Sequence, residues 1–306
     1  MKDNARIVFL GTPEFAAASL KALVKAGMNV VAVVTAPDRP AGRGMELKQS
    51  AVKQLALELE LPVLQPEKLK SPGFLEELKA FKADIQVVVA FRMLPEVVWN
   101  MPLLGTINLH GSLLPQYRGA APINWAIING ESITGVTTFK LKHEIDTGNI
   151  LLREEIPIGE RETAGELHDR MMIIGADLVV RTVRGLFAGE LKEQPQDTGM
   201  EIKHAPKIFT STCEINWNQP VKKVYDLVRG LSPYPAAFTQ LDGKILKIFS
   251  AEKITGDHNE VPGHMETDKK SYLRFYCADG YLDVTELQLQ GKKRLKIKEF
   301  LRGYRG

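Results

Sequence analysis

Short apolar runs alternate with longer amphipathic segments through the first part of the chain. The runs have the composition of buried strands, and they cover 5–11, 29–37, 62–66, 85–91 and 105–110. The segments between them place apolar residues at helical spacing, at 12–27, 50–61 and 72–83. Strands that alternate with helices imply right-handed crossovers and a mostly parallel sheet covered on both faces. We therefore predict an α/β fold here.

Two further elements complete the predicted first domain. Residues 137–158 form two alternating segments around an Asp-Thr-Gly-Asn turn, which indicates an antiparallel hairpin. Residues 163–189 have the period of a long amphipathic helix, and Thr163 and Glu166 have the spacing of a capping box at its start. The first domain is therefore predicted to span 1–189.

A change of pattern predicts a second domain at 208–306. The polar stretch at 190–207 carries two prolines and is interpreted as a linker. After a short helix at 220–231, alternating strands are separated by Asp-Gly, Ala-Asp-Gly and Gln-Gly turns, and the last strand is predicted at 293–304. Several short antiparallel strands in such a segment favour a small β-barrel of the oligonucleotide-binding type.

Composition narrows the class of protein. The chain has 306 residues, of which 44% are hydrophobic, so it can bury a sizeable core. Its first residues lack the apolar region of a signal peptide, and no apolar run reaches the roughly 18 residues that a membrane span needs. Cys213 and Cys277 lie far apart and fit reduced core thiols. We predict a cytoplasmic protein that has no membrane association.

The turn FLGTPEF, which follows the first apolar run, invites comparison with phosphate-binding turns. A dinucleotide-binding fingerprint needs three glycines at fixed spacing, and this turn has only Gly11. Pro13 occupies the tight turn itself. A structural turn is therefore favoured over binding of a cofactor pyrophosphate.

Asn108 and His110 end a predicted strand and are the first candidates for chemistry. Ligands of open parallel sheets bind beyond the carboxyl ends of strands, and period-two alternation puts both side chains on one face. A carboxamide beside an imidazole suits stabilisation of an oxyanion together with proton transfer. A histidine bonded to a loop carbonyl is the plainer interpretation. Asp146 is either a turn former or the carboxylate that orients the imidazole and favours its charged form.

Other reaction classes have less support in the sequence. Ser112 lacks the local context of a nucleophile elbow, so direct transfer is favoured over covalent catalysis. His143, His168 and His204 offer no third ligand at a sensible spacing for a metal. We therefore predict a reaction that uses no metal.

Positive charge gathers at two places along a chain whose net charge is only +3. The segment 35–48, predicted as an exposed mobile loop, carries Arg39, Arg43 and Lys48. The last 15 residues set one acid, Glu299, against the basic residues Lys292, Lys293, Arg294, Lys296, Lys298, Arg302 and Arg305. Each segment is either merely solvated or a contact for the phosphates of an anionic substrate larger than a metabolite.

Six motifs, spread over most of the chain, together indicate a family resemblance. They are FLGTPEFA, APDRPAGRG, NLHGSLLPQYRGAAPINWAI, IDTG, HAPKI and LSPYPAAF. With them the chain resembles the methionyl-tRNA formyltransferase family over essentially its whole length. Asn, then His, then Ser-Leu-Leu-Pro, with a later Asp-Thr-Gly, is specific to formyl transfer from 10-formyltetrahydrofolate. PDRPAGRG and the C-terminal domain narrow the resemblance to the tRNA enzymes.

The resemblance implies a Rossmann-like catalytic domain followed by an oligonucleotide-binding-like domain. It implies formyl transfer from 10-formyltetrahydrofolate to the α-amine of initiator methionyl-tRNA, for translation initiation, with Asn108, His110 and Asp146 as catalytic residues. The folate-binding residues would be Phe91, Arg92, Ser112, Leu113, Leu114 and Pro115. The tRNA-binding residues would be Arg39, Arg43, Lys48, Lys207, Lys292, Lys293, Arg294 and Lys296. We expect a monomer that needs no metal.

The chain also departs from the family's pattern. AFRMLP at 90–95 stands where the family commonly has Tyr-Gly before Leu-Pro, so the floor of the folate pocket is expected to differ. KHEIDTG and FTSTCEINW are further departures. One alternative function is formyl transfer to a nucleotide sugar or to glycinamide ribonucleotide, which has no evident use for PDRPAGRG or the basic C-terminal end. A catalytically inert tRNA-binding protein is the other, and the set of Asn108, His110 and Asp146 argues against it.

Overall fold

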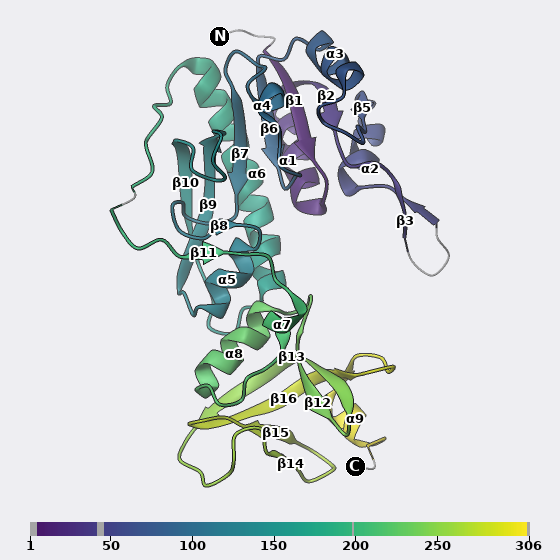
Figure 1. The fold of residues 1–306 in the computed structure, drawn as a ribbon, viewed down its shortest axis with the longest axis vertical. Helices are drawn as coiled ribbons and strands as arrows, with labels where there is room; N and C mark the ends of the chain where they lie inside the picture. The colour runs from purple at the N-terminus through teal and green to yellow at the C-terminus, as the bar shows by residue number, and fades with distance from the viewer. Residues whose placement is uncertain (1–4, 42–45, 198, 305–306) are drawn as a thin grey trace. The chain divides into compact units, whose positions relative to one another are not determined.

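The first compact unit of the chain is built on a mostly parallel sheet. The computed structural model describes residues 5–41, 46–197 and 199–304, and its seven-stranded sheet has the order β10–β9–β7–β6–β1–β2–β5 (Figure 1). β9 runs antiparallel to β7, whereas the strands from β7 to β5 pair in parallel. The strands are β1 Arg6–Gly11, β2 Asn29–Val34, β5 Val63–Leu64, β6 Ile85–Val89, β7 Thr106–His110, β9 Ile133–Lys140 and β10 Ile150–Pro157. The predicted α/β fold is confirmed.

Helices connect the parallel strands and bury one face each. α1 begins directly after Pro13 and buries Leu20 and Leu23 on one side. α2 is capped by Ser50, whose hydroxyl accepts the backbone N–H of Lys53. The helices in this part of the chain are α1 Glu14–Lys25, α2 Ala51–Glu58, α3 Pro72–Ala80, α4 Glu96–Trp99 and α6 Ala164–Ala188. α1, α2, α3 and α6 agree with the predicted helical segments to within a few residues, whereas α4 was not predicted.

The order of the strands reverses between β1 and β6, and this reversal marks a binding edge. From β1 the chain moves to β2 and β5 on one side and then returns to β6 on the other. Ligands of such sheets bind outside the carboxyl ends of the strands at this point. Gly11 at the end of β1 lies opposite Val89 of β6. A Cβ on Gly11 would lie 2.6 Å from that of Ala16, so the glycine allows close packing of α1.

Packing of α6 determines which face of β7 is left for chemistry. Leu109 packs against Gly175 of α6, where an added Cβ would lie 2.8 Å from the Leu109 side chain. Successive residues of a strand point to opposite faces. Asn108 and His110 therefore point away from α6, whereas Leu109 between them is buried against this helix.

The second compact unit comprises residues 120–134, 157–167 and the chain from 205 onward. Its curled antiparallel sheet has the order β12–β13–β16–β15–β14, and α8 packs Val224 and Val228 into its apolar core. Its elements are α5 Pro122–Ile128, α7 Thr210–Cys213, α8 Val221–Gly230, β12 Ala237–Leu241, β13 Lys244–Thr255, β14 Met265–Thr267, β15 Leu273–Tyr276 and β16 Gly280–Leu289. Two short strands, β8 Arg118–Gly119 and β11 His204–Ala205, lie outside both large sheets. This half-barrel agrees with the predicted small β domain.

The strand predicted at 293–304 is wrong over most of its length. β17 covers only Leu295–Lys296, and α9 covers Ile297–Leu301. Phe300 and Leu301 are 8% and 2% exposed, and both enter the core of the second unit. Two adjacent buried side chains fit the inner face of a helix, because successive side chains of a strand point to opposite faces.

Candidate active site

The carboxyl ends of β6 and β7 form one edge of the sheet, and two of the three predicted catalytic residues, Asn108 and His110, lie there. The two strands are parallel neighbours, with Val88 opposite Asn108. His110 is the last residue of β7 and is 6% exposed, whereas Asn108 is half-buried. Among the residues that the structure describes, the Asn108 carboxamide has no hydrogen-bond partner. Its N–H groups are therefore available to a ligand.

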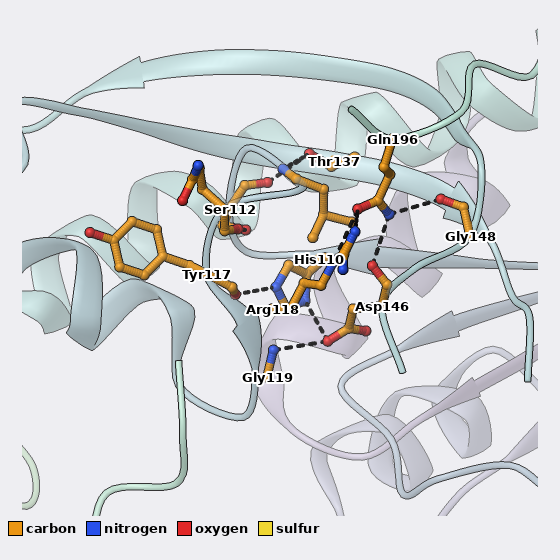
Figure 2. A network of polar contacts seen from close by, with 11 residues as sticks. His110, Ser112, Tyr117, Arg118, Gly119, Thr137, Asp146, Gly148 and Gln196 are labelled. Carbon is orange, nitrogen blue, oxygen red and sulfur yellow. Dashed lines mark hydrogen bonds and ion pairs between the residues drawn. The ribbon is translucent and has the colours of Figure 1, made fainter. Parts of the chain in front are cut away.

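The imidazole of His110 is held at one nitrogen and faces Asp146 with the other. Nε2 lies 2.8 Å from the carbonyl oxygen of Tyr117, which can only accept, so Nε2 carries a hydrogen. Nδ1 lies 3.9 Å from Oδ2 of Asp146, which is too far for a hydrogen bond (Figure 2). Both interpretations of His110 therefore describe part of its surroundings, a loop carbonyl on one side and a carboxylate on the other.

The turn that carries Asp146 is explained by its sequence. Asp146 has a φ of 55°, in the left-handed region that Asp tolerates better than most residues. Its Oδ2 accepts the backbone N–H of Gly119 at 3.0 Å. A Cβ on Gly148 would lie 1.6 Å from the carbonyl oxygen of Lys140, so only glycine fits there. Asp-Thr-Gly thus suits the tip of the β9–β10 hairpin, and the hairpin prediction is confirmed.

Gln196 belongs to this site and was missed by the sequence analysis. It lies in the 190–207 stretch that was interpreted as a linker. Its side-chain amide contacts the backbone of the Asp146 turn and the guanidinium of Arg118 (Figure 2). Beside Pro195 in a polar stretch, no sequence signal separates this glutamine from a solvated one. Its role becomes visible only when the stretch packs back on the first unit.

Two side chains of the Ser112–Pro115 loop, predicted to line a folate pocket, are instead used within the protein: the Ser112 hydroxyl in a hydrogen bond and Leu114 in the core. The Ser112 hydroxyl donates to the carbonyl oxygen four residues later at 2.6 Å. The Thr137 hydroxyl donates to the Ser112 carbonyl at the same distance. Leu114 is fully buried, whereas Leu113 is half-buried. Leu113 and the loop backbone are therefore the parts of this segment that a ligand can reach most easily.

Phe91 and Arg92 follow β6 at the same edge of the sheet. Ala90 has a φ of 46°, so the chain turns sharply as the strand ends. The Arg92 guanidinium donates to the carbonyl oxygens of Pro66 and Glu67 and lies 5.5 Å from the Phe91 ring centroid. Burial lowers the pKa of Arg92 below its usual value. Arg92 thus braces the end of β6 against the segment that follows β5.

The cationic segment 35–48, which was predicted as an exposed mobile loop, contains a short hairpin. Its strands are β3 Arg39–Ala41 and β4 Glu46–Lys48. They pair Arg39 with Lys48, and both residues are exposed. Arg43, the third predicted tRNA contact of this segment, lies outside the described residues. The two described cations therefore sit side by side on one exposed hairpin.

Polar contacts fix the base of this hairpin to the sheet. Asp38 accepts hydrogen bonds from Lys53 Nζ at 2.5 Å and from the Gln65 amide at 2.8 Å. The hydrogen bond from Lys53 holds the pKa of the Asp38 carboxyl below its usual value. The hydroxyls of Thr35 and Ser50 form a further hydrogen bond, with 2.7 Å between their oxygens. The hairpin thus projects from an anchored base.

The basic residues near the C-terminus differ in their surroundings. Lys292 and Lys293 are exposed in the turn after β16, and neither has an ion pair within the described part of the chain. Arg294 and Lys296 lie 2.6 Å and 3.4 Å from Glu286, and the Arg294 hydrogen bond lowers the pKa of that carboxyl. Lys292 and Lys293 therefore carry the positive charge that is least compensated.

Lys207 opens the C-terminal part of the second unit with an exposed charge. Its Nζ lies 5.8 Å from the centroid of the Phe209 ring, within the range of a cation–π contact. Phe209 is itself 59% exposed. The pair presents a cation and an aromatic face together, which suits contact with a nucleic acid.

No group of three or more His, Cys, Asp or Glu side chains among the described residues is placed to hold a metal ion. No helix in the same residues combines the length and the apolar character needed to cross a membrane. Cys213 and Cys277 are buried free thiols, as predicted, and burial raises the pKa of Cys277 to about 12.

Comparisons of the sequence find relatives along both units. A family model described as Formyl transferase matches residues 5–183, and one described as Formyl transferase, C-terminal domain matches residues 207–305. A methionyl-tRNA formyltransferase of Bacteroides fragilis is 55% identical over 311 residues, which cover 99% of this chain and 96% of the relative. One of Parabacteroides distasonis is 57% identical over 314 residues, which cover 99% and 97%.

Solved structures share the fold at lower identity. An N-formyltransferase of Helicobacter canadensis, in complex with folinic acid and dTDP-3-aminofucose, has a TM-score of 0.67 at 18% identity and covers 95% of this chain and 100% of its own. HypX of Aquifex aeolicus, in complex with tetrahydrofolic acid, has a TM-score of 0.62 at 20% identity. It covers 97% of this chain and 48% of its own. At these identities the likeness concerns the fold.

Proposed function

The chain belongs to the formyl transferase family, and on that premise we propose that Asn108, His110 and Asp146 transfer a formyl group from 10-formyltetrahydrofolate to the α-amine of methionyl-tRNA. The protein is an enzyme, and its product is the N-formylmethionyl-tRNA with which translation begins. The observation that carries the assignment of residues is the sheet edge where His110 Nδ1 and Asp146 Oδ2 lie 3.9 Å apart. An acid–base pair needs this kind of proximity.

The choice of methionyl-tRNA as acceptor is supported by both units. Relatives named for this acceptor match nearly the whole chain at more than half identity, whereas the sugar-modifying structure is 18% identical. A small nucleotide-sugar acceptor has no evident use for the exposed cations Lys292 and Lys293. An inert tRNA-binding protein has no evident use for His110 beside Asp146.

Comparison of acceptors tests this choice directly. The purified protein would be given 10-formyltetrahydrofolate and, in separate reactions, charged initiator tRNA, a nucleotide-linked amino sugar and glycinamide ribonucleotide. We expect kcat/KM for the charged tRNA to exceed the others by about 10²-fold or more, as sites built for one acceptor achieve. Faster formylation of a small acceptor would support the first alternative. Binding of tRNA without turnover would support the second.

The proposed reaction begins when the α-amine attacks the formyl carbon and ends when the bond from that carbon to folate N10 breaks. Negative charge develops on the formyl oxygen, which accepts hydrogen bonds from the Asn108 carboxamide and from Nδ1–H of protonated His110. The Tyr117 carbonyl occupies Nε2, so Nδ1 is the nitrogen left for the substrates. The Asp146 carboxylate offsets the imidazolium charge and accepts the proton that the amine loses. This proton passes to N10 as the bond to the formyl carbon breaks, so tetrahydrofolate leaves as a neutral amine and Asp146 returns to its charged form.

The folate donor is assigned to the edge formed by the end of β6 and the 112–115 loop. Met93 is 75% exposed, and a large apolar side chain in this position gains stability when a flat ring system covers it. Phe91 and Leu113 are half-buried and add apolar surface. Because β6 and β7 are parallel neighbours, a donor bound here shares its sheet edge with His110. Arg92 would act by bracing this edge.

Contacts to tRNA are assigned to the exposed cations of both units. Arg39 and Lys48 stand on the anchored hairpin of the first unit, and Arg43 is assigned to the same segment by sequence alone. Lys207, Lys292 and Lys293 provide exposed charge in the second unit, while Arg294 and Lys296 share Glu286. Salt-dependent attraction to phosphates would supply most of their contribution.

Charge reversal at Lys292 and Lys293 tests the tRNA assignment. The double variant Lys292→Glu, Lys293→Glu is expected to weaken tRNA binding and to reduce the slope of log Kd against log salt by about 2, since two phosphate contacts are lost. Filter binding over a salt series measures this slope. Lys269→Glu with Lys270→Glu, two adjacent exposed lysines of the same unit, provides the matched control. An equal loss in both double variants would indicate only a general effect of net charge.

Three further proposals concern the roles of the domains, the oligomeric state and the cellular compartment. We assign residues 1–189 to catalysis, 190–207 to a linker and 208–306 to tRNA binding. We also propose a monomer, whose mass in sedimentation equilibrium would be that of a single 34.0 kDa chain. The two buried thiols, Cys213 and Cys277, suit a reducing compartment such as the cytoplasm.

A further inference from the structure

Three consecutive residues, 117 to 119, join the parts of the candidate site. The Tyr117 carbonyl accepts from His110, and the Gly119 N–H donates to Asp146. Arg118, between them, directs its guanidinium to Gln196. The same glutamine contacts the turn that carries Asp146 (Figure 2). A single short segment and one glutamine therefore connect the imidazole with the carboxylate.

The contacts of Gln196 fix the orientation of its amide. Nε2 lies 2.8 Å from the carbonyl oxygen of Asp146 and 2.8 Å from that of Gly148. Oε1 lies 3.1 Å from Nε and 2.6 Å from Nη2 of Arg118. Carbonyl oxygens only accept and a guanidinium only donates, so the amide nitrogen must face the turn and the amide oxygen must face Arg118. Every donor and acceptor of the Gln196 side chain amide is used.

Apart from Gln196, few contacts join the Asp146 turn to the rest of the unit, although within the turn the Thr147 hydroxyl donates to the Glu144 carbonyl oxygen at 3.0 Å. Residues 142–145, which precede it, are exposed. Asp146 itself has the left-handed φ of 55°, which costs about 1–2 kcal/mol for most residues and is less unfavourable for Asp. Its carboxylate accepts one hydrogen bond, from Gly119. Gln196 holds the backbone on both sides of Thr147 and so fixes where that carboxylate lies.

We propose that Gln196 is a positioning residue for formyl transfer, which acts by clamping the backbone of the Asp146 turn to Arg118. The inference rests on the proposed role of Asp146 and adds to it the side chain that sets its place. A displacement of about 1 Å of a reacting group costs up to about 10²-fold in rate. Loss of the clamp therefore acts on kcat, while substrate binding stays nearly unchanged.

Gln196→Glu removes the clamp with the smallest change of shape. The carboxylate keeps an acceptor for Arg118, but it turns a second oxygen toward two carbonyl oxygens and has no hydrogen to donate. Gln196→Met removes both contacts without adding a charge. Gln194→Glu provides the matched control, because Gln194 is exposed, lies two residues earlier and has no side-chain hydrogen bond within the described residues.

Kinetics with methionyl-tRNA and 10-formyltetrahydrofolate give the first readout. Gln196→Glu and Gln196→Met are expected to lower kcat about 10- to 100-fold, with both KM values within about twofold of wild type. Gln194→Glu is expected to match wild type. In an Asp146→Asn background, Gln196→Glu should cost less than about threefold, because the group it positions has already lost its function.

Hydrogen exchange gives a second readout that needs no activity. The Gly119 amide is bonded to the Asp146 carboxylate, so its exchange should be about tenfold faster in Gln196→Glu if the turn shifts. Wild-type kcat in Gln196→Glu, or an equal loss with and without Asp146, would overturn the inference. A wild-type protein that does not formylate methionyl-tRNA would instead overturn the proposed function, and the exchange experiment would still decide whether the clamp exists.

Discussion

His110→Ala is expected to lower the single-turnover rate of formyl transfer about 10²–10³-fold. The substitution removes the Nδ1–H donor from the developing negative charge on the formyl oxygen. It also leaves the Tyr117 carbonyl without its donor, at a cost of about 1–3 kcal/mol to folding. Typical domains have 5–15 kcal/mol of stability, so the variant should still fold. Rapid-quench measurement of formylmethionyl-tRNA at saturating substrates isolates the chemical step.

The control for this variant is His264→Ala. The His264 imidazole is 50% exposed and lies 3.6 Å from a Glu260 oxygen, so its loss should change the rate by less than twofold. Near wild-type single-turnover transfer by His110→Ala would show that His110 has no catalytic role. Its hydrogen bond to the Tyr117 carbonyl would then be purely structural.

Asp146→Asn is expected to have a comparable effect, about 10²–10⁴-fold on kcat. Asparagine keeps the size of the side chain and an oxygen that accepts the Gly119 N–H, so the turn should persist. It loses the negative charge beside His110 and the capacity to take the amine proton. KM for methionyl-tRNA should change little. Initial rates over a range of tRNA concentrations separate the two parameters.

Asp177→Asn serves as the matched control for the carboxylate. Asp177 lies on α6, is 68% exposed and pairs with Arg181. An ion pair this exposed contributes little to the stability of the fold. The substitution should therefore leave both kinetic parameters unchanged. A loss in Asp146→Asn that appears only in KM would show that Asp146 binds the acceptor and takes no part in the proton transfer.

The strand ends of the candidate site could be predicted from the sequence because they depend on local pattern. Alternating apolar residues end at His110, and period two puts Asn108 on the same face. The Asp-Thr-Gly turn could be predicted as well, because its residue types are typical of turns. The structure gives the reason for the glycine: β9 approaches Gly148 too closely for any side chain. The residues alone left two roles open for Asp146, a turn former or the partner of His110. Family resemblance decided between them, because the two residues lie 36 positions apart in the sequence.

Contacts that depend on tertiary packing could not be predicted. A loop carbonyl beside His110 was one of the two interpretations, but nothing in the sequence identifies it as that of Tyr117, because every residue carries a backbone oxygen. Gln196 carries no sequence signal either, because a solvated glutamine has the same polar neighbours in the sequence. The short helix α9 was predicted as a strand for a related reason. Leu295 and Ile297 alternate with lysines as in a strand. The core that receives Phe300 and Leu301 together is built from segments distant in the sequence.

The most direct test of the reaction site is the single-turnover rate of a double variant. Wild type, His110→Ala, Asp146→Asn and the combined variant would be compared with charged initiator tRNA and 10-formyltetrahydrofolate. Residues that act as one unit are strongly non-additive, so the combined variant is expected to be no more than about threefold slower than the slower single variant. A combined loss equal to the product of the two single losses would mean that His110 and Asp146 act independently, and it would contradict the shared site proposed for them.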